Sequence, residues 1–218
     1  MPKVYPVIHY KDDDTTIAEA ELAKEVGADG VFLISHIGRN ENLIPLAIKI
    51  KELFGFKVGL NFLGNTAIYT ANVVKDNNLD MIWADSCGVT SKGLDQEGIE
   101  LKKWYEENKN IEVFASVAFK YQAVDNNPPL AALEAQKAGF IPTTSGSGTG
   151  SAPTIDKIKS MSEETSGLLG VASGMNCENI NSFKPYLSHI LVSTGVSKDE
   201  HHFDYEKLYR FIILAKMV

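Results

Sequence analysis

The sequence predicts a closed (β/α)8 barrel, and three observations lead to this prediction. Short runs rich in β-branched and aromatic residues alternate strictly with amphipathic segments, eight times along the 218 residues. Most of these runs are continuously apolar, which is typical of strands covered on both faces in a parallel sheet. No Pro-, Gly- or Ser-rich linker divides the chain, so residues 1–218 are expected to form one domain.

The expected strands and helices follow one another in order along the chain. The strands are 4–10, 30–35, 57–63, 81–86, 111–119, 139–144, 167–173 and 189–194. The helices are 15–28, 42–55, 66–78, 96–108, 129–139, 154–164, 177–187 and 204–218. Threonines open the first helix and Gly55 closes the second, as is usual at helix ends. Gly27 and Gly139 lead directly from a helix into a strand, which is the common chemistry of an αβ turn.

The length of the chain is near the lower limit for a barrel of eight units, so short loops are expected. The alternative fold is an open, doubly wound sheet with helices on both faces. Eight consecutive units without an antiparallel strand favour the closed barrel over the open sheet.

The composition argues against several classes of function. A formal net charge of -7 and a pI near 5.3 disfavour non-specific binding to nucleic acid or to an anionic membrane surface. The N-terminus lacks the apolar core of a signal peptide, and no stretch reaches the ~20 apolar residues of a membrane helix. Cys87 and Cys177 form no metal or redox motif and are expected to be buried, which suits a cytoplasmic protein.

In a barrel of this kind the active site lies at the carboxyl ends of the strands. Asp85 and Lys120 each end an apolar run, so both are expected at this rim. A carboxylate and an amine from neighbouring strands can shift each other's pKa and act as an acid–base pair. Alternatively, Lys120 is a Schiff-base amine, or the two residues form a structural salt bridge. His9 and His36 also end strands and are further acid–base candidates.

Three loops rich in glycine and hydroxyl residues predict a phosphate site. They follow the sixth, seventh and eighth expected strands, and barrels often bind phosphate at the last two of these. Glycine lets backbone N–H groups approach an anion closely, and a helix N-terminus favours negative charge. The expected phosphate-binding residues are Ser145, Gly146, Thr149, Gly150, Ser173, Gly174, Ser193, Thr194 and Gly195. Asn61 and Asn65, around the end of the third strand, complete the predicted ligand-binding set.

Six segments carry a further signal: "GADGVFLIS", "VGLNFLGN", "ADSCGVTSKGLDQEG", "GSGTGSAPTIDKIKSM", "LLGVASGMNCENI" and "ILVSTGVSKD" with the following "FDYEKLYRFI". Together they resemble the BtpA/SgcQ family of barrel proteins over nearly the whole chain. The resemblance implies a ribulose-phosphate-binding type of barrel, and members are linked by name to photosystem I biogenesis or to sugar operons. It also implies rim positions for Asn61, Asn65, Asp85, Lys120, Ser145, Gly146, Thr149, Gly150, Gly174 and Gly195.

The chain departs from that family in its first strand. The family has a His-Leu-Pro segment there, whereas this chain reads "VIHYKDDDTT". The loop after the second strand is also short. Both loops shape the far side of the pocket, so the departure concerns the substrate rather than the fold.

Two stretches raise the question of a metal. Asp12, Asp13 and Asp14 offer adjacent carboxylates of the kind that divalent cations prefer, but a helix N-cap in a solvated loop is the plainer interpretation. His201 and His202 are consecutive and lack HExxH spacing, so no metal site is expected there. No Walker or GxGxxG motif is present, and no cofactor is expected.

These observations support two main functional hypotheses. The first is an enzyme acting on a small phosphorylated metabolite, a sugar phosphate or phosphoribosyl compound, with isomerase, lyase and glycosyl-bond chemistry all open. The second is a non-catalytic barrel that binds a phosphorylated ligand as an assembly or regulatory factor. A weaker third hypothesis is metal-assisted hydrolysis through 12–14. The broad apolar face of the last helix leaves a homodimer open.

Overall fold

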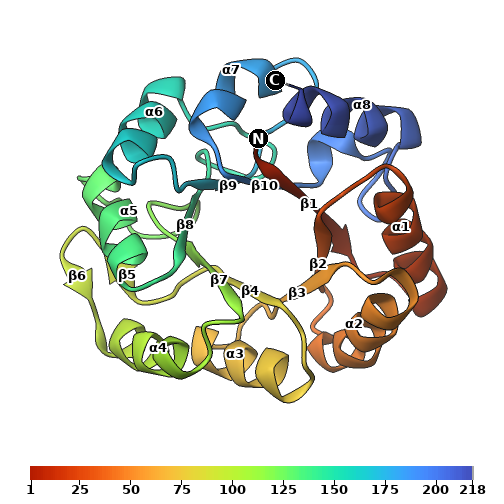
Figure 1. Cartoon of the computed structure of the whole chain (residues 1–218), viewed down its shortest axis with the longest axis horizontal. Helices are drawn as coiled ribbons and strands as arrows, with labels where there is room; N and C mark the ends of the chain where they lie inside the picture. Colours follow the sequence, from red (N-terminus) through yellow and green to blue (C-terminus); the bar gives the residue numbers. More distant parts are fainter. Residues whose placement is uncertain (218) are drawn as a thin grey trace.

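The computed structural model describes residues 1–217, and in it eight parallel strands close into a barrel surrounded by helices (Figure 1). In ring order the strands are β1 (Lys3–His9), β2 (Gly30–Ile34), β3 (Lys57–Asn61), β4 (Met81–Ala84), β7 (Glu112–Ser116), β8 (Ile141–Thr144), β9 (Gly170–Ala172) and β10 (His189–Val192). β10 pairs in parallel with β1, with Val4 opposite Ile190, and this pairing closes the ring. The predicted (β/α)8 fold is therefore confirmed.

The helices lie outside the barrel, between successive strands. Their bounds are α1 (Asp13–Glu25), α2 (Asn40–Phe54), α3 (Ala67–Asp76), α4 (Gln96–Glu107), α5 (Pro128–Lys137), α6 (Ile155–Glu164), α7 (Ile180–Phe183) and α8 (Tyr205–Lys216). The side chains of Asp12, Thr66, Asp95 and Thr154 each accept a hydrogen bond from a backbone N–H in the first turn of the following helix. These N-caps explain where the four helices begin.

The predicted elements are found, but many of their ends lie one to four residues from the predicted ones. The fifth barrel strand ends at Ser116 rather than at residue 119, because Ala118 has a φ of 45°, which a strand does not allow. The predicted helix 177–187 is only a short α7 followed by the 3-10 turn η1 (Lys184–Tyr186), since Pro185 supplies no N–H to a continuing helix. A small hairpin of β5 (Val89–Thr90) and β6 (Gly93–Leu94), absent from the prediction, lies between β4 and α4.

Large apolar side chains fill the inside of the barrel. This interior cluster consists of Tyr5, Val7, Phe32, Ile34, Met81, Trp83, Phe114, Phe119, Ile141, Ala172 and Leu191. Phe32 and Phe114 pack edge to face with their ring centroids 5.2 Å apart, and Gly59 on β3 leaves the space that Phe32 occupies. A second, larger cluster joins the outside of the barrel to the helices. The barrel is therefore a packed core rather than a channel.

His189 lies at the amino-terminal end of the interior, opposite to the βα loops. Its ring stacks on Tyr5 at 6.2 Å, and its Nδ1 lies 2.8 Å from the Ser188 hydroxyl. Burial, partly offset by the Glu112 carboxylate, lowers the pKa of His189 to about 4. The imidazole is therefore neutral at pH 7, and its protonation opposes folding.

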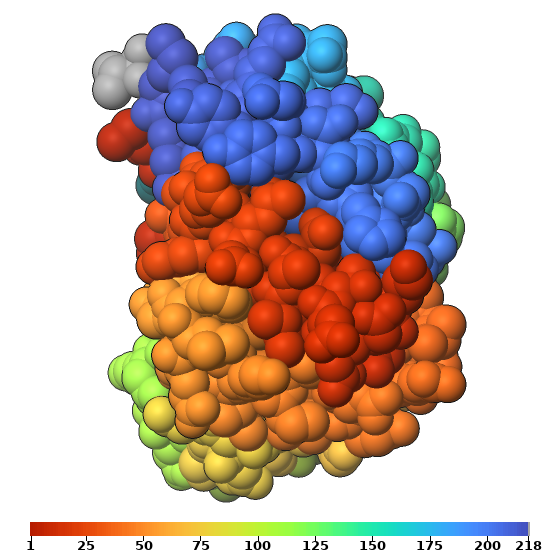
Figure 2. Space-filling view, turned by 90° about the vertical axis from the view of Figure 1, so that its right-hand side faces the viewer, coloured from red at the N-terminus to blue at the C-terminus, as the bar shows by residue number. Residues whose placement is uncertain are grey.

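The first and last βα units lie side by side, as ring closure requires, and Figure 2 shows their red and blue surfaces in contact. The Phe203 backbone N–H donates to the buried Glu19 carboxylate of α1 at 2.7 Å. Near the C-terminus, the Lys216 ammonium lies 2.8 Å from the Asp29 carboxylate. These two contacts connect the last βα unit to the first, in addition to the pairing of β10 with β1.

Helix α8 has two different faces. Its inner face buries Leu208, Phe211, Ile212 and Ala215 against the barrel. On its outer face Tyr205, Tyr209 and Ile213 remain partly exposed at helical spacing. A homodimer through this outer face stays a prediction. Among residues 1–217, no helix combines the length and the apolar content that crossing a membrane requires.

We expect His189→Asn to reduce the loss of stability on acidification. A histidine whose pKa falls from 6.5 to about 4 on folding gives its full contribution to stability above pH 6.5 and loses it as the pH falls towards 4. Between pH 7 and 5 this loss is about 2 kcal/mol in the free energy of unfolding. Urea unfolding at both pH values measures it. Equal losses in the wild-type and variant proteins would contradict the expectation.

Candidate functional site

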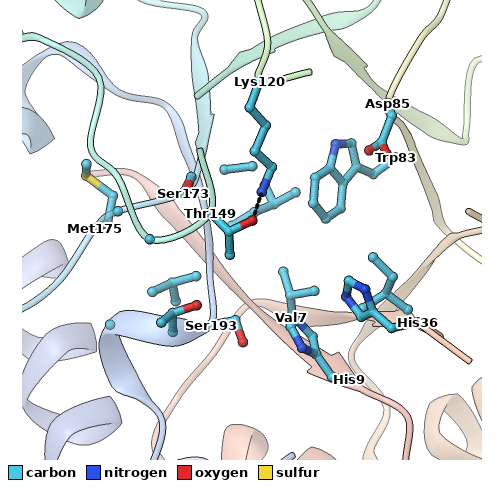
Figure 3. A pocket seen from close by; sticks show the side chains of 18 of the residues that line it. Val7, His9, His36, Trp83, Asp85, Lys120, Thr149, Ser173, Met175 and Ser193 are labelled. Carbon is cyan, nitrogen blue, oxygen red and sulfur yellow. Dashed lines mark hydrogen bonds between the residues drawn. The ribbon is translucent and has the colours of Figure 1, made fainter. Parts of the chain in front are cut away.

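A cavity of about 300 Å³ opens at the carboxyl ends of the barrel strands (Figure 3). Its floor is the upper part of the interior cluster, including Val7, Ile34, Trp83 and Leu191. The predicted site residues that line it are His9, His36, Asp85, Lys120, Thr149, Gly150, Ser173, Gly174, Ser193, Thr194 and Gly195. The structure thus brings residues from both ends of the chain to one site.

The loops after β8, β9 and β10 pack directly on one another beside this cavity. A Cβ atom at Gly174 would overlap the backbone of Ala152 in the preceding loop. A Cβ atom at Gly195 would overlap the carbonyl oxygen of Met175. Glycine is therefore required at positions 174 and 195, because the neighbouring backbones approach too closely for a side chain. The three loops form one continuous wall.

Several backbone N–H groups in this wall have no partner. Within residues 1–217, the N–H groups of Gly174, Met175, Thr194 and Gly195 donate no hydrogen bond to another protein atom. Thr194 and Gly195 begin the short 3-10 helix η2 (Thr194–Val196), in which the first N–H groups have no acceptor. Adjacent backbone N–H groups without an acceptor are a feature of many anion-binding loops.

Two histidine rings line another part of the cavity. His9 and His36 have ring centroids 4.8 Å apart, and Figure 3 shows them together at the ends of β1 and β2. Burial, with a smaller contribution from His36, lowers the pKa of His9 to about 4. His9 is therefore neutral at physiological pH, and its buried Nδ1 has no hydrogen-bond partner. A buried polar atom without a partner is uncommon in a folded protein, which sets this histidine apart from an ordinary core residue.

Asp85 and Lys120 both line the cavity but do not contact each other. They form no ion pair within residues 1–217, and in Figure 3 the Trp83 indole lies between their charged ends. The Lys120 ammonium lies 3.4 Å from the Thr149 hydroxyl, on the side of the glycine-rich wall. The Asp85 carboxylate lies 3.5 Å from the Asn61 amide. The salt bridge considered as an alternative is therefore not formed, and both charges remain available to a ligand.

Four predicted ligand-binding residues lie outside the lining of this cavity. They are Asn61, Asn65, Ser145 and Gly146. Asn61 is 1% exposed, and Asn65 accepts a hydrogen bond from the Asn40 amide at 2.9 Å. The buried Ser145 hydroxyl accepts from the backbone N–H of Lys120 at 2.8 Å. Direct contact between these four residues and a ligand stays a prediction.

Trp83, Tyr121 and Met175 also line the cavity, although no sequence pattern marked them as site residues. Trp83 lies in an apolar run that fits a core strand, and its indole N–H donates to the Ser116 hydroxyl at 3.0 Å. Strand alternation is the signal that identifies it. Trp83 precedes Asp85 by two residues, so the expected strand 81–86 directs both side chains to the same face, although β4 itself ends at Ala84.

The stretches considered for a metal have other partners in the structure. Asp12 caps α1 by accepting from the Thr15 N–H at 2.8 Å. The His202 Nδ1 lies 2.8 Å from the Asp199 carboxylate. Within the residues that the structure describes, no group of three or more His, Cys, Asp or Glu side chains is arranged to hold a metal ion.

No family model and no curated protein matches the chain, but many solved structures do. Phosphoribosylanthranilate isomerase from Thermotoga maritima is 18% identical, with a TM-score of 0.70 over 99% of both chains. Orotidine 5'-monophosphate decarboxylase from Methanocaldococcus jannaschii is 14% identical, with a TM-score of 0.70 over 100% of both chains. (S)-3-O-geranylgeranylglyceryl phosphate synthase from Thermoplasma acidophilum is 16% identical, with a TM-score of 0.67 over 100% of this chain and 94% of that one.

At these identities the similarity to solved structures establishes the fold alone. The neighbours are barrels that match this chain from end to end, which agrees with the closed ring described above. Membership of the BtpA/SgcQ family stays a prediction, because no family model supports it.

We expect Gly195→Ala to disrupt the wall of packed loops. The added methyl group would meet the Met175 carbonyl oxygen, so the loops must separate, which lowers the free energy of unfolding by about 1 to 3 kcal/mol. Gly148→Ala is the matched control, because nothing lies within 4 Å of the added methyl group there. The control should change stability by less than about 0.5 kcal/mol. Urea unfolding that finds no difference between the two variants would argue against this packing.

Proposed function

We propose that the protein is an enzyme that acts on a small phosphorylated metabolite, such as a sugar phosphate or a phosphoribosyl compound. The observation that carries the proposal is the set of unpaired N–H groups of Gly174, Met175, Thr194 and Gly195 beside one cavity. A phosphate group accepts hydrogen bonds from such groups. Barrels frequently hold phosphate with the loops after the seventh and eighth strands and the N-terminus of a short extra helix, which is the position of η2.

The solved structures that resemble the chain support the same class of substrate. By their names they are an isomerase of phosphoribosylanthranilate, a decarboxylase of orotidine 5'-monophosphate and a synthase of a glyceryl phosphate. All three names contain a phosphorylated compound, but they describe three different reactions. The proposal therefore extends to the substrate class, and it leaves isomerase, lyase and glycosyl-bond chemistry open.

In this proposal the two sides of the cavity have different tasks. The glycine-rich wall holds the phosphate, and the rest of the ligand extends over Trp83 towards His9 and Asp85. Lys120, beside Thr149, either neutralises part of the phosphate charge or attacks a carbonyl carbon of the substrate. Asp85 transfers protons, and the neutral His9 ring hydrogen-bonds the reacting end of the ligand.

The alternative is a barrel that binds a phosphorylated ligand without converting it, as an assembly or regulatory factor. One observation favours it. Asp85 and Lys120 lie apart and form no ion pair within residues 1–217, so they do not form a contacting acid–base pair. The glycine-rich wall binds phosphate under both hypotheses, which therefore differ only in whether the ligand is converted.

We expect phosphorylated compounds to raise the thermal unfolding temperature. Suitable probes are inorganic phosphate, ribose 5-phosphate and glucose 6-phosphate, with ribose and glucose as controls that lack the phosphate. At 100 times its Kd a ligand adds about 2.7 kcal/mol to the stability. For a domain of this size this corresponds to a shift of about 5 to 10 °C. Equal, negligible shifts with all five compounds would count against the phosphate site.

Variants at Asp85 and Lys120 separate the two hypotheses. We expect Asp85→Asn and Lys120→Met to slow the conversion of a ligand found in this way by at least about 100-fold, because each variant removes a group proposed to act on the reacting atoms. The Asp85→Asn protein should keep the affinity for the ligand, since the carboxylate lies away from the phosphate wall. Phosphorus-31 NMR follows the conversion. A ligand that the wild-type protein binds but never converts would support the binding protein instead.

A further inference from the structure

The segment that carries Lys120 leaves β7 through an unusual backbone. Ala118 has a φ of 45° and Tyr121 a φ of 65°, although neither residue is glycine. Left-handed conformations of this kind persist only where the surrounding structure holds them in place. The segment 116–122 must therefore be fixed by contacts from outside its own backbone.

Gln122 supplies the first set of these contacts. Its amide nitrogen donates to the carbonyl oxygens of Ser116 at 3.1 Å and Asp85 at 2.6 Å. Its amide oxygen accepts from the backbone N–H of Phe119 at 3.0 Å. One side chain thus closes the turn around Lys120 and joins it to the end of β4, where the other candidate catalytic residue lies.

Lys157, in the first turn of α6, supplies the second set. Its ammonium donates to the carbonyl oxygens of Ala118 at 2.7 Å and Ser145 at 2.9 Å. Ser145 also accepts from the Lys120 N–H through its hydroxyl. Within residues 1–217, Lys157 forms no ion pair, so its half-buried charge is compensated by backbone carbonyl groups alone.

We propose that Gln122 and Lys157 are positioning residues of the site, which hold the left-handed turn so that the Lys120 amine faces the cavity beside Thr149. Figure 3 shows Lys120 extended from this turn towards the Thr149 hydroxyl. The inference rests on the proposed function, because it gives Lys120 a task at the phosphate-binding cavity. It adds two residues, neither of which lines that cavity, that determine where the amine lies.

The chemistry of the two side chains supports this role over an incidental one. An amide can donate to two carbonyl groups and accept from an N–H at the same time, whereas a carboxylate in place of Gln122 would repel the two carbonyl oxygens. An ammonium has three donors, and Lys157 directs two of them at successive βα loops. Both residues therefore match their partners in hydrogen-bonding character, and both join the Lys120 turn to a neighbouring loop.

Pyridoxal 5'-phosphate is the probe for this proposal, since it carries a phosphate and an aldehyde. The neutral Lys120 amine attacks the aldehyde carbon, the oxygen leaves as water, and a C=N bond forms. Borohydride then supplies hydride to the imine carbon and solvent supplies a proton to the nitrogen, which gives a stable secondary amine. Absorbance follows the rate of imine formation, and peptide mass spectrometry locates the labelled lysine. Titration with inorganic phosphate separately measures the affinity of the glycine-rich wall for phosphate.

We expect Gln122→Met and Lys157→Met to slow imine formation at Lys120 at least tenfold, whereas inorganic phosphate still binds to the backbone N–H groups of the glycine-rich wall. Lys157→Arg should recover the rate to within about threefold, because a guanidinium also donates to two carbonyl groups. Lys159→Met is the matched control, since Lys159 is an exposed lysine on the same helix, and it should react like the wild-type protein. Circular dichroism establishes that each variant is folded.

Each outcome decides a different claim. If both methionine variants form the imine at the wild-type rate, the positioning role of Gln122 and Lys157 is overturned. If a folded Lys157→Arg protein reacts as slowly as Lys157→Met, the positioning role of Lys157 is overturned. If a methionine variant does not fold, Lys157→Arg and Gln122→Glu test the proposal instead. We expect a nearly wild-type rate of imine formation for Lys157→Arg and a slow rate for Gln122→Glu. Phosphate binding without any labelling of Lys120 would overturn this inference alone. Failure of the wild-type protein to bind either probe would overturn the proposed function.

Discussion

Ring closure is the constraint on which the rest of the structure depends. Because β10 pairs with β1, all eight parallel strands end at the same rim, and His9 and Gly195 line one cavity although they come from opposite ends of the chain. An open sheet would leave two unpaired edges and would separate the first loop from the last. The topology therefore determines which residues meet at the candidate site, and the side chains then determine its chemistry.

The rim that closure creates is not uniform. On one side, glycines at 174 and 195 let three successive loops share backbone contacts, so that unpaired N–H groups collect there. On the other side, His9 and His36 come directly from the ends of β1 and β2 and bring their rings to the same cavity. Trp83 lines the same cavity beside Asp85, and its indole N–H donates to the Ser116 hydroxyl at 3.0 Å. A ligand with a charged end and a less charged end fits this division.

Local patterns predicted the fold and the placement of most candidate site residues around one cavity, because strand burial and helix caps are encoded over a few residues. Those patterns could not show that Lys120 turns towards Thr149 rather than towards Asp85. That direction depends on the left-handed turn at 118–121, on Gln122 in the same loop and on Lys157, which comes from α6. Strand alternation was informative for residues within strands, but it carries no information about loop backbones with positive φ.

The position of Trp83 in the cavity bears on the tryptophan fluorescence of the protein. The chain contains two tryptophans, and the other, Trp104, lies on the outer helix α4 with its indole N–H bonded to the Asn72 side chain at 3.0 Å. Indole fluorescence depends on the polarity and the quenching groups around the ring. Because Trp83 lines the cavity and Trp104 does not, we expect a ligand in the cavity to change the emission of Trp83 and not that of Trp104.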